Sequence, residues 1–314
     1  MKRRMGQEFA ERQIIIMKKE ITVKQEHEVL SLINDIAFAC VPAWYNAARR
    51  NLKMSVVCPK ERKGHEPMPL IVWVCGGAFR LVDRAVWVPE MMYFARRGYV
   101  VASVEYRTSP EAEFPGALCD VKAAVRYLRA HAEDYCIDPK RVAIMGESAG
   151  GALASLVGTT GGCEEFEQGD FLEYSSKVDA VVDYYGLVDI ENVNLAGAGT
   201  HDVPPFTCED WIGLNYTKEM ARKASAIHYV DENTPPFLIF QGEEDICVLP
   251  EQSERMYQRL TENNVCTEYY VLKGEGHGAP AFYQDCIKDI VLRFLNKILP
   301  INELKSMAEG CTVK

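Results

Sequence analysis

The feature that most restricts how this chain folds is residues 146–150, which read Gly-Glu-Ser-Ala-Gly. An apolar run at 141–145 predicts a strand before this motif, and residues 148–158, rich in Ala and Gly, predict a helix after it. A sharp strand-to-helix turn strains the backbone of Ser148, so the residues two before and two after it must be small. The turn places the Ser148 hydroxyl beside a helix N-terminus, which favours negative charge. We interpret Ser148 as a nucleophile; the alternative is a structural serine in a tight turn.

Short apolar runs alternate with helical patterns along most of the chain. Strands that are apolar throughout, separated by helices, predict an α/β fold: a mostly parallel central sheet with helices on both faces. The clearest helix contains Leu118, Val121, Val125 and Leu128 at helical spacing. The expected strands are 52–58, 70–74, 99–104, 141–145, 178–185, 236–241 and 268–272, and the other expected helices are 89–97, 148–158, 282–299 and one that begins near Pro250.

We expect residues 1–314 to form a single domain, with 1–50 as an N-terminal extension and 187–234 as a small lid insertion. The lid is inferred from length, because connections in such folds usually have about 2–6 residues. This stretch contains Trp211 and several Gly and Pro residues, and its alternative is a surface helix with plain loops. Residues 1–20 are charged and weakly periodic, which favours a mobile segment or a loosely docked helix.

A serine hydroxyl is a weak nucleophile unless a neighbouring base takes its proton. Among the six histidines, His277 has the most suitable surroundings, because it lies in the glycine-flanked loop 274–278 directly after a predicted strand. His201 and His228 lie in the predicted lid, where each could contact a substrate. His277 is therefore the candidate base.

The base needs an acid that fixes its tautomer and stabilises its charged form. In folds with this motif the chain order is Ser, acid, His. Asp245 fits this order and follows the predicted strand 236–241, at the edge of the sheet where such folds bind ligands. Glu243 and Glu244 are rival acids, and Asp189 is a weaker one.

A glycine-rich loop at 75–79 follows the predicted strand 70–74. Gly76, Gly77 and Ala78 allow backbone N–H groups to approach a tetrahedral oxyanion, and the N–H of Ala149 is a further donor. The alternative is an ordinary Gly-Gly turn. The loop does not match a dinucleotide-binding motif, because the Gly-x-Gly-x-x-Gly pattern is missing.

Composition excludes several classes of protein. Apolar residues make up 48% and charged residues 25%, as in ordinary globular proteins. The net charge of −10 argues against nucleic-acid binding, and no apolar run is long enough for a membrane span. The 11 cysteines contain no Cys-x-x-Cys pair, and the apolar run 14–17 is too short for a secretory signal. We therefore expect a cytoplasmic protein with no membrane partner.

Taken together, these motifs resemble the α/β-hydrolase-fold serine esterases of the hormone-sensitive-lipase-like and bacterial acetyl-xylan or feruloyl esterase type. The matching segments are 75–79, 99–107, 114–151, 242–248 and 274–278, and the resemblance covers roughly residues 50–298. It implies hydrolysis of carboxylic esters through Ser148, Asp245 and His277. It also implies an oxyanion hole formed by Gly77, Ala78 and Ala149.

The resemblance carries further expectations about the site. Cys75 and Ala78 stand where the family usually has a histidine and a third glycine. Cys75 removes a possible hydrogen bond that stabilises the loop, whereas Ala78 still offers its backbone N–H. Phe79, Glu147 and Trp211 are candidate substrate contacts, although Trp211 could simply pack the lid. Asp120 and Glu147 fit supporting roles beside the reacting groups, or else a helix cap and a surface charge.

The expected substrate is a small-molecule ester, with a short acyl group or an acetyl group on a carbohydrate. No metal or organic cofactor is implied. A homo-oligomer fits the resemblance, since such enzymes are often dimers or larger. Two other functions stay open: an amidase similar to kynurenine formamidase, and a non-catalytic receptor or binding protein on the same fold.

Overall fold

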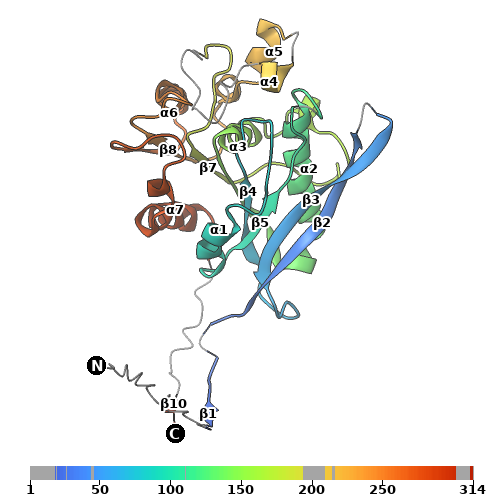
Figure 1. Cartoon of the computed structure of the whole chain (residues 1–314), viewed down its shortest axis with the longest axis vertical. Coiled ribbons are helices and arrows are strands. Elements are labelled where there is room, and N and C mark those ends of the chain that lie inside the picture. The colour runs from blue at the N-terminus through green and yellow to red at the C-terminus, as the bar shows by residue number, and fades with distance from the viewer. Residues whose placement is uncertain are drawn as a thin grey trace, which may run out of the picture. The chain divides into compact units, whose positions relative to one another are not determined.

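An eight-stranded sheet forms the centre of residues 29–304 in the described part of the chain (Figure 1). The computed structural model describes residues 18, 20–25, 27–43, 46–109, 111–193, 209–213, 216–301 and 312–313. The strands are Leu30–Ala43 (β2), Ala48–Pro59 (β3), Met68–Val74 (β4), Val100–Val104 (β5), Ile137–Glu147 (β6), Ala180–Tyr184 (β7), Phe237–Gly242 (β8) and Thr267–Leu272 (β9).

The strand order is β2-β3-β5-β4-β6-β7-β8-β9. β3 is antiparallel to both of its neighbours, and all other neighbouring strands are parallel. This confirms the predicted mostly parallel sheet. In a parallel sheet the carboxyl ends of the strands meet at one edge, so the loops that follow β4, β6, β8 and β9 lie near one another.

Both faces of the sheet are buried, as the continuous apolar strands predict. In β4, Leu70, Val72 and Val74 pack into one core cluster, and Ile71 and Trp73 pack into the other. All five side chains are fully buried. The alternation arises because successive side chains of a strand point to opposite faces.

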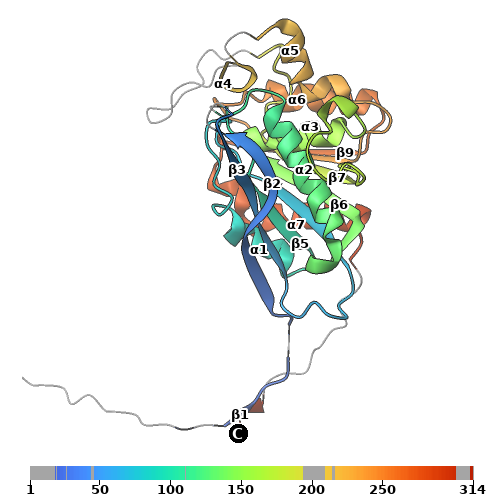
Figure 2. The ribbon, with the colours of Figure 1, turned by 90° about the vertical axis from the view of Figure 1, so that its right-hand side faces the viewer.

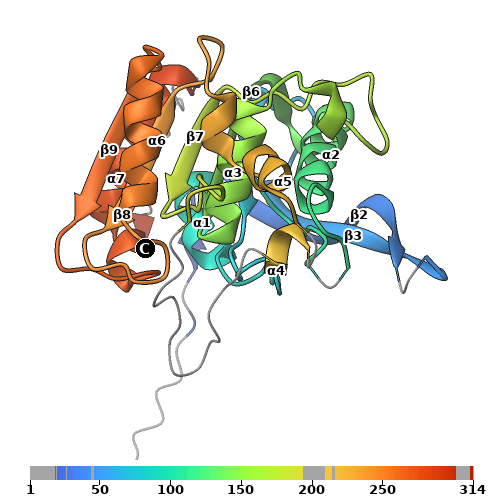
Figure 3. The same ribbon diagram turned by 90° about the horizontal axis from the view of Figure 1, so that it is seen from above.

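Helices cover the two faces in two layers. α2 (Gly116–Ala130), α3 (Ala149–Thr159) and α6 (Glu251–Glu262) pack against the first core cluster, whereas α1 (Val88–Ala95) and α7 (Asp285–Ile298) pack against the second. Seen from above, α6 lies beside β8 and β9, and α3 lies beside β7 (Figure 3). The predicted helix 282–299 is divided in the structure, because Pro280–Tyr283 forms a short 3-10 turn (η4) before α7.

β2 lies within residues 1–50, which the sequence pattern assigned to an N-terminal extension. Its pairing with β3 shifts register twice, between Ile33 and Ile36 and between Ala37 and Ala39. Asp35 has a positive φ of 60° at the first shift. Such bulges break the alternation of apolar and polar residues that identifies a strand in a sequence. β2 is also an edge strand with many exposed side chains, so its apolar signal is weak.

Residues 1–28 and 305–314 form a separate unit. In it, β1 (Ile21–Thr22) pairs antiparallel with β10 (Thr312–Val313). Nearly all of the segment 1–20 lies outside the described residues. Across the described ranges, no helix is both long enough and apolar enough to cross a lipid bilayer.

The connection from β7 to β8 holds the predicted lid. Its described part contains α4 (Glu209–Ile212), α5 (Lys218–Lys223) and the 3-10 turn η3 (Ala226–Tyr229). α4 and α5 lie together beyond one end of the sheet (Figures 1 and 2). His201 lies outside the described residues, and His228 contacts Glu191 at 2.9 Å. We call the described residues 209–213 and 216–229 the cap.

Candidate active site

Ser148 occupies the turn between β6 and α3, with φ of 56° and ψ of −122°. Glycine is required on both sides of Ser148, at positions 146 and 150, because there is no room for a side chain at either one. A Cβ on Gly146 would lie 2.2 Å from the carbonyl oxygen of Gly150, and a Cβ on Gly150 would lie 2.0 Å from the carbonyl oxygen of Val74. The geometry matches the strained turn that the sequence predicts.

His277, the candidate base, lies beside this serine. Its Nε2 atom lies 2.9 Å from Oγ of Ser148, across 129 residues of sequence. The side chain of His277 is 20% exposed, and its ring meets the edge of the Tyr185 ring at a centroid distance of 4.7 Å. The distance allows a direct proton transfer from the hydroxyl to the imidazole.

Asp245 lies on the other side of the imidazole. Its Oδ2 atom is 2.7 Å from Nδ1 of His277, and its side chain is fully buried. Its Oδ1 atom accepts the backbone N–H groups of Cys247 and Val248, at 2.8 and 2.9 Å. Charge-assisted bonds of this kind fix the orientation of a carboxylate. Asp245 is thus placed to select the His277 tautomer that carries its proton on Nδ1.

The rival acids lie elsewhere. Glu243 pairs with Lys273 at 2.6 Å and accepts the backbone N–H of Gly274. Glu244 is exposed at the surface. Asp189 is buried and accepts a hydrogen bond from Arg255 at 2.9 Å. Asp245 is the one of the four acids that the structure places on His277.

The loop after β4 has an unusual backbone. Gly77, Ala78 and Phe79 have successive positive φ angles of 132°, 52° and 57°. For a non-glycine residue this conformation costs about 1–3 kcal/mol, so the surroundings must hold it. The N–H groups of Arg80 and Leu81 bond to the carbonyl oxygen of Gly77, at 3.0 and 3.2 Å. The loop therefore has a defined shape although Cys75 and Ala78 depart from the family pattern.

Glu147 connects this loop to the serine turn. Its Oε1 atom accepts the backbone N–H of Gly76, and also Nε1–H of Trp87 at 3.2 Å. Gly76 therefore anchors the loop, and its N–H is not directed at a substrate as the sequence predicted. Burial raises the pKa of the Glu147 carboxyl, while nearby His277 and the two donors act in the opposite direction. Glu147 thus supports the loop, which is one of its three predicted roles; the others were a substrate contact and a surface charge.

Phe79 and Trp211 are buried against each other. Their rings stack with centroids 4.0 Å apart and an interplanar angle of 5°. Phe79 is 2% exposed and Trp211 is 1% exposed. The predicted substrate contact does not agree with this burial, because each aromatic face is covered by protein. The alternative predicted for Trp211 was that it packs the lid. Both Trp211 and Phe79 have such a packing role in the structure.

Asp120 holds a neighbouring loop. Its carboxylate accepts the backbone N–H of Arg107 and two N–H groups of the Arg107 guanidinium, at 2.8–2.9 Å. The preceding residue, Tyr106, donates its hydroxyl to the carbonyl oxygen of Cys75 at 2.8 Å. Asp120 therefore supports the strand end beside the Gly-rich loop and does not cap α2.

A family model described as BD-FAE matches residues 54–260, which is more than half of the chain. The chain belongs to the BD-FAE family. Esterase LipC of Mycobacterium tuberculosis is 33% identical to it over 224 residues, or 68% of this chain and 53% of LipC. The chain spans about half the length of the curated relatives it matches.

Solved structures share the fold of this BD-FAE chain. A truncated carbohydrate esterase from gut microbiota is 25% identical, with a TM-score of 0.68 over 88% of this chain and 98% of its own. The esterase Est2 of Thermogutta terrifontis is 20% identical and shares the fold, with a TM-score of 0.68 over 91% of this chain and 95% of its own. These likenesses confirm the predicted α/β-hydrolase fold.

Some residues of this BD-FAE site carry little or no signal in the sequence. Gln241 donates to Oδ2 of Asp245 at 3.2 Å, and Ser253 donates to Gln241 in turn at 2.7 Å. Tyr185, which follows β7, contacts His277 and bonds to the hydroxyl of Tyr283 at 2.9 Å. Gln241 interrupts an otherwise apolar strand, which is a weak pointer to a buried polar role.

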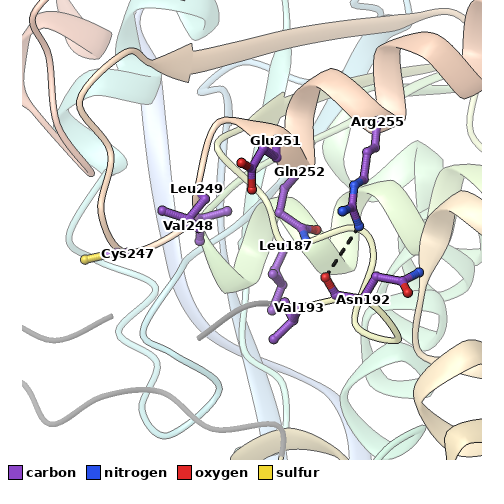
Figure 4. A pocket seen from close by; sticks show the side chains of 9 residues that line it. All are labelled: Leu187, Asn192, Val193, Cys247, Val248, Leu249, Glu251, Gln252 and Arg255. Carbon is purple, nitrogen blue, oxygen red and sulfur yellow. Dashed lines mark hydrogen bonds between the residues drawn. The ribbon is translucent and has the colours of Figure 1, made fainter. Parts of the chain in front are cut away.

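A pocket of about 180 Å³ lies beside the loop that carries Asp245 (Figure 4). At its polar end Arg255 donates to the backbone oxygen of Asn192 at 3.4 Å. In the part of the chain that the structure describes, no group of three or more His, Cys, Asp or Glu side chains could hold a metal ion. The pocket is lined by Leu187, Asn192, Val193, Cys247, Val248, Leu249, Glu251, Gln252 and Arg255.

Proposed function

We propose that this chain is a serine hydrolase that cleaves carboxylic esters through an acyl-enzyme on Ser148. The observation that carries the proposal is the hydrogen-bonded series from Ser148 through His277 to Asp245, with distances of 2.9 and 2.7 Å. A nucleophile, a base and an orienting acid in this order are the requirements of acyl transfer by serine. The esterases among the chain's relatives support the same reaction class.

In the first half-reaction, Oγ of Ser148 attacks the carbonyl carbon of the ester while Nε2 of His277 takes its proton. The negative oxygen of the tetrahedral intermediate is stabilised by backbone N–H groups of Gly77, Ala78 and Ala149. Asp245 stabilises the imidazolium that forms. His277 then returns the proton to the leaving alcohol, and the acyl group stays on Ser148.

In the second half-reaction a water molecule replaces the alcohol. Nε2 of His277 takes a proton from the water, whose oxygen attacks the acyl carbon. The same N–H groups receive the second oxyanion. His277 then protonates Oγ of Ser148, the carboxylic acid leaves, and the enzyme is restored.

The proposed substrates are esters of short acyl groups, including acetyl groups on small carbohydrates. A carbohydrate esterase and an acetyl ester-xyloside bifunctional hydrolase from Caldicellulosiruptor lactoaceticus are among the chain's structural neighbours. These neighbours support esters of short acyl groups on small carbohydrates.

Of the other two functions, a non-catalytic receptor fits the site poorly. Receptors on this fold usually lack one of the three residues, whereas Ser148, Asp245 and His277 are joined here by hydrogen bonds. A formamidase would use the same three residues. Hydrolysis rates on N-formylkynurenine and on esters distinguish these two enzyme classes.

The test is a series of initial rates on p-nitrophenyl esters from acetate to octanoate, with Ser148→Ala as control. We expect fast hydrolysis of the acetate, slower hydrolysis as the chain lengthens, and none above background in the variant. Folded wild-type protein that hydrolyses no ester, or a variant that keeps the wild-type rate, would contradict the proposal.

A further inference from the structure

An aromatic pair joins the cap to the Gly-rich loop. Trp211, in α4, stacks on Phe79, which directly follows Ala78 in the loop after β4. The two rings are parallel within 5° and are almost completely buried. Stacked aromatic pairs contribute beyond their buried area and restrict the position of both rings. The cap therefore contacts the loop at the residue next to a proposed oxyanion donor.

Phe79 needs such a restraint. Both Ala78 and Phe79 adopt positive φ angles, 52° and 57°, which residues with a Cβ rarely occupy. Conformations of this kind persist only when the surroundings fix them. The backbone oxygen of Phe79 accepts the N–H of Ser109 at 2.7 Å, which fixes the chain but not the ring. The ring belongs to the first core cluster and stacks there on Trp211.

Trp211 is itself firmly placed. Its backbone oxygen accepts the N–H of Phe114 at 2.9 Å, and its ring meets the Phe114 ring edge-on at a centroid distance of 5.6 Å. The next residue, Ile212, is fully buried. Gly213 lies so close to Glu113 that a Cβ there would be 2.3 Å from the Glu113 carboxyl carbon. Phe114 and the burial of α4 therefore fix the position of Trp211 beside Phe79.

We propose that Trp211 is a positioning residue for the oxyanion-stabilising loop, acting through Phe79. The cap would then contribute to the rate of the chemical step without touching the substrate. The inference rests on the proposed function, because it assumes that the N–H groups of Gly77 and Ala78 stabilise an oxyanion. Without the stack, the strained backbone at 78–79 relaxes and these donors move away from the oxyanion.

The test replaces Trp211 by residues that separate stacking from filling space. Trp211→Phe keeps a planar ring, whereas Trp211→Leu keeps apolar volume without one. Tyr216→Leu, an aromatic-to-leucine change at a 38% exposed residue of the same cap, is the matched control. Phe79→Leu removes the same stack from the opposite side. Circular dichroism and thermal melting establish that each variant is folded.

Two kinetic readouts report on the oxyanion hole itself. One is kcat and KM for p-nitrophenyl acetate. The other is the inhibition constant of 1,1,1-trifluorobutan-2-one, whose carbonyl carbon is attacked by Oγ of Ser148 to give a tetrahedral adduct with a negative oxygen. We expect Trp211→Leu to lower kcat about tenfold or more, with KM little changed, and to weaken the inhibitor by a similar factor. Trp211→Phe and Tyr216→Leu should stay near wild type.

The possible results separate this inference from the proposed function. Folded Trp211→Leu protein with wild-type kcat and inhibitor affinity would overturn the positioning role, and so would equal losses in Trp211→Leu and Trp211→Phe. If Trp211→Leu does not fold, the same kinetic criteria decide on Phe79→Leu. An active Ser148→Ala variant would instead remove the proposed function. An inactive Ser148→Ala beside an unaffected Trp211→Leu would remove only this inference.

Discussion

Nε2 of Gln241 lies 3.2 Å from Oδ2 of Asp245, and both side chains are buried. The same carboxylate oxygen faces Nδ1 of His277, while the other accepts two backbone N–H groups. Gln241 is in turn held by the hydroxyl of Ser253 at 2.7 Å. The position of the acid is therefore determined by β8, by its own loop and by α6, and not by His277 alone.

This arrangement predicts a large effect of Asp245→Asn. The amide would offer an N–H group to His277, which favours the tautomer that has its proton on Nε2 and cannot accept one from Ser148. We expect kcat on p-nitrophenyl acetate to fall about 10⁴-fold, as for the equivalent change in serine proteases, with the fold intact. The matched controls are Glu243→Gln and Glu244→Gln, which should keep nearly full activity. If Glu244→Gln were the more damaging change, Asp245 would not be the acid.

The serine turn predicts that Gly146→Ala is harmful. The new Cβ would lie 2.2 Å from the carbonyl oxygen of Gly150, so the backbone must shift. We expect a loss of roughly 1–3 kcal/mol in the free energy of unfolding, which is typical of overpacking. Displacing Ser148 by about 1 Å should also lower kcat by about 10²-fold. Urea unfolding and initial rates measure the two effects.

Gly161→Ala is a suitable control for this change. The nearest atoms to a Cβ there belong to the flexible side chain of Lys177, at 3.2 Å and beyond. This variant should retain its activity and most of its stability. Equal behaviour of the two alanine variants would show that close packing at Gly146 does not restrict the turn.

The sequence predicted those parts of the site that depend on the local conformation of the backbone. The motif around Ser148 predicts a turn that only small neighbours allow, and the structure has that turn. Asp245 and His277 could be placed because each follows a predicted strand, and the carboxyl ends of parallel strands share an edge. β2 could not be predicted, because its two register shifts remove the period of two.

Contacts between side chains that lie far apart in the sequence were harder to predict. The sequence places Gly76 in a donor loop but does not indicate that Glu147 accepts its N–H, because this bond joins residues 71 positions apart. The burial of Phe79 by Trp211 likewise depends on how the cap packs, which no periodicity encodes. Such contacts arise from tertiary packing, which overrides local pattern.

The double acceptor role of Glu147 predicts a contrast between two variants. Gly76 N–H and Trp87 Nε1–H both donate to Oε1, so Glu147→Gln can accept both through its amide oxygen. Glu147→Ala leaves both donors without this acceptor, at a cost of about 1–3 kcal/mol each if they stay buried. We expect Glu147→Ala to lower kcat and the free energy of unfolding, and Glu147→Gln to stay near wild type. Equal loss in both would point to the charge of Glu147 and not to its hydrogen bonds.

A buried carboxyl away from the reacting groups predicts how stability depends on pH. Asp183, in β7, is fully buried and accepts hydrogen bonds from Ser155 and from the backbone N–H of Gly186, at 3.1 and 2.9 Å. Burial raises the pKa of its carboxyl from 3.8 to about 7, although both donors oppose the shift. Between these values the folded chain holds a proton that the unfolded chain has lost. The contribution of Asp183 to stability therefore falls as pH rises through this window.

Asp183→Asn should remove this part of the pH dependence. Asparagine cannot ionise, has nearly the same shape, and can accept the N–H of Gly186 while donating to the hydroxyl of Ser155. Relative to the wild type, the variant should gain up to about 1.4 kcal/mol in the free energy of unfolding for each pH unit from 5 to 7. Urea unfolding of both proteins at pH 5, 6, 7 and 8 measures the difference, in which the titration of all other groups cancels. A difference that does not change with pH would mean that Asp183 ionises alike in the folded and unfolded chains, and that burial in β7 does not keep it neutral.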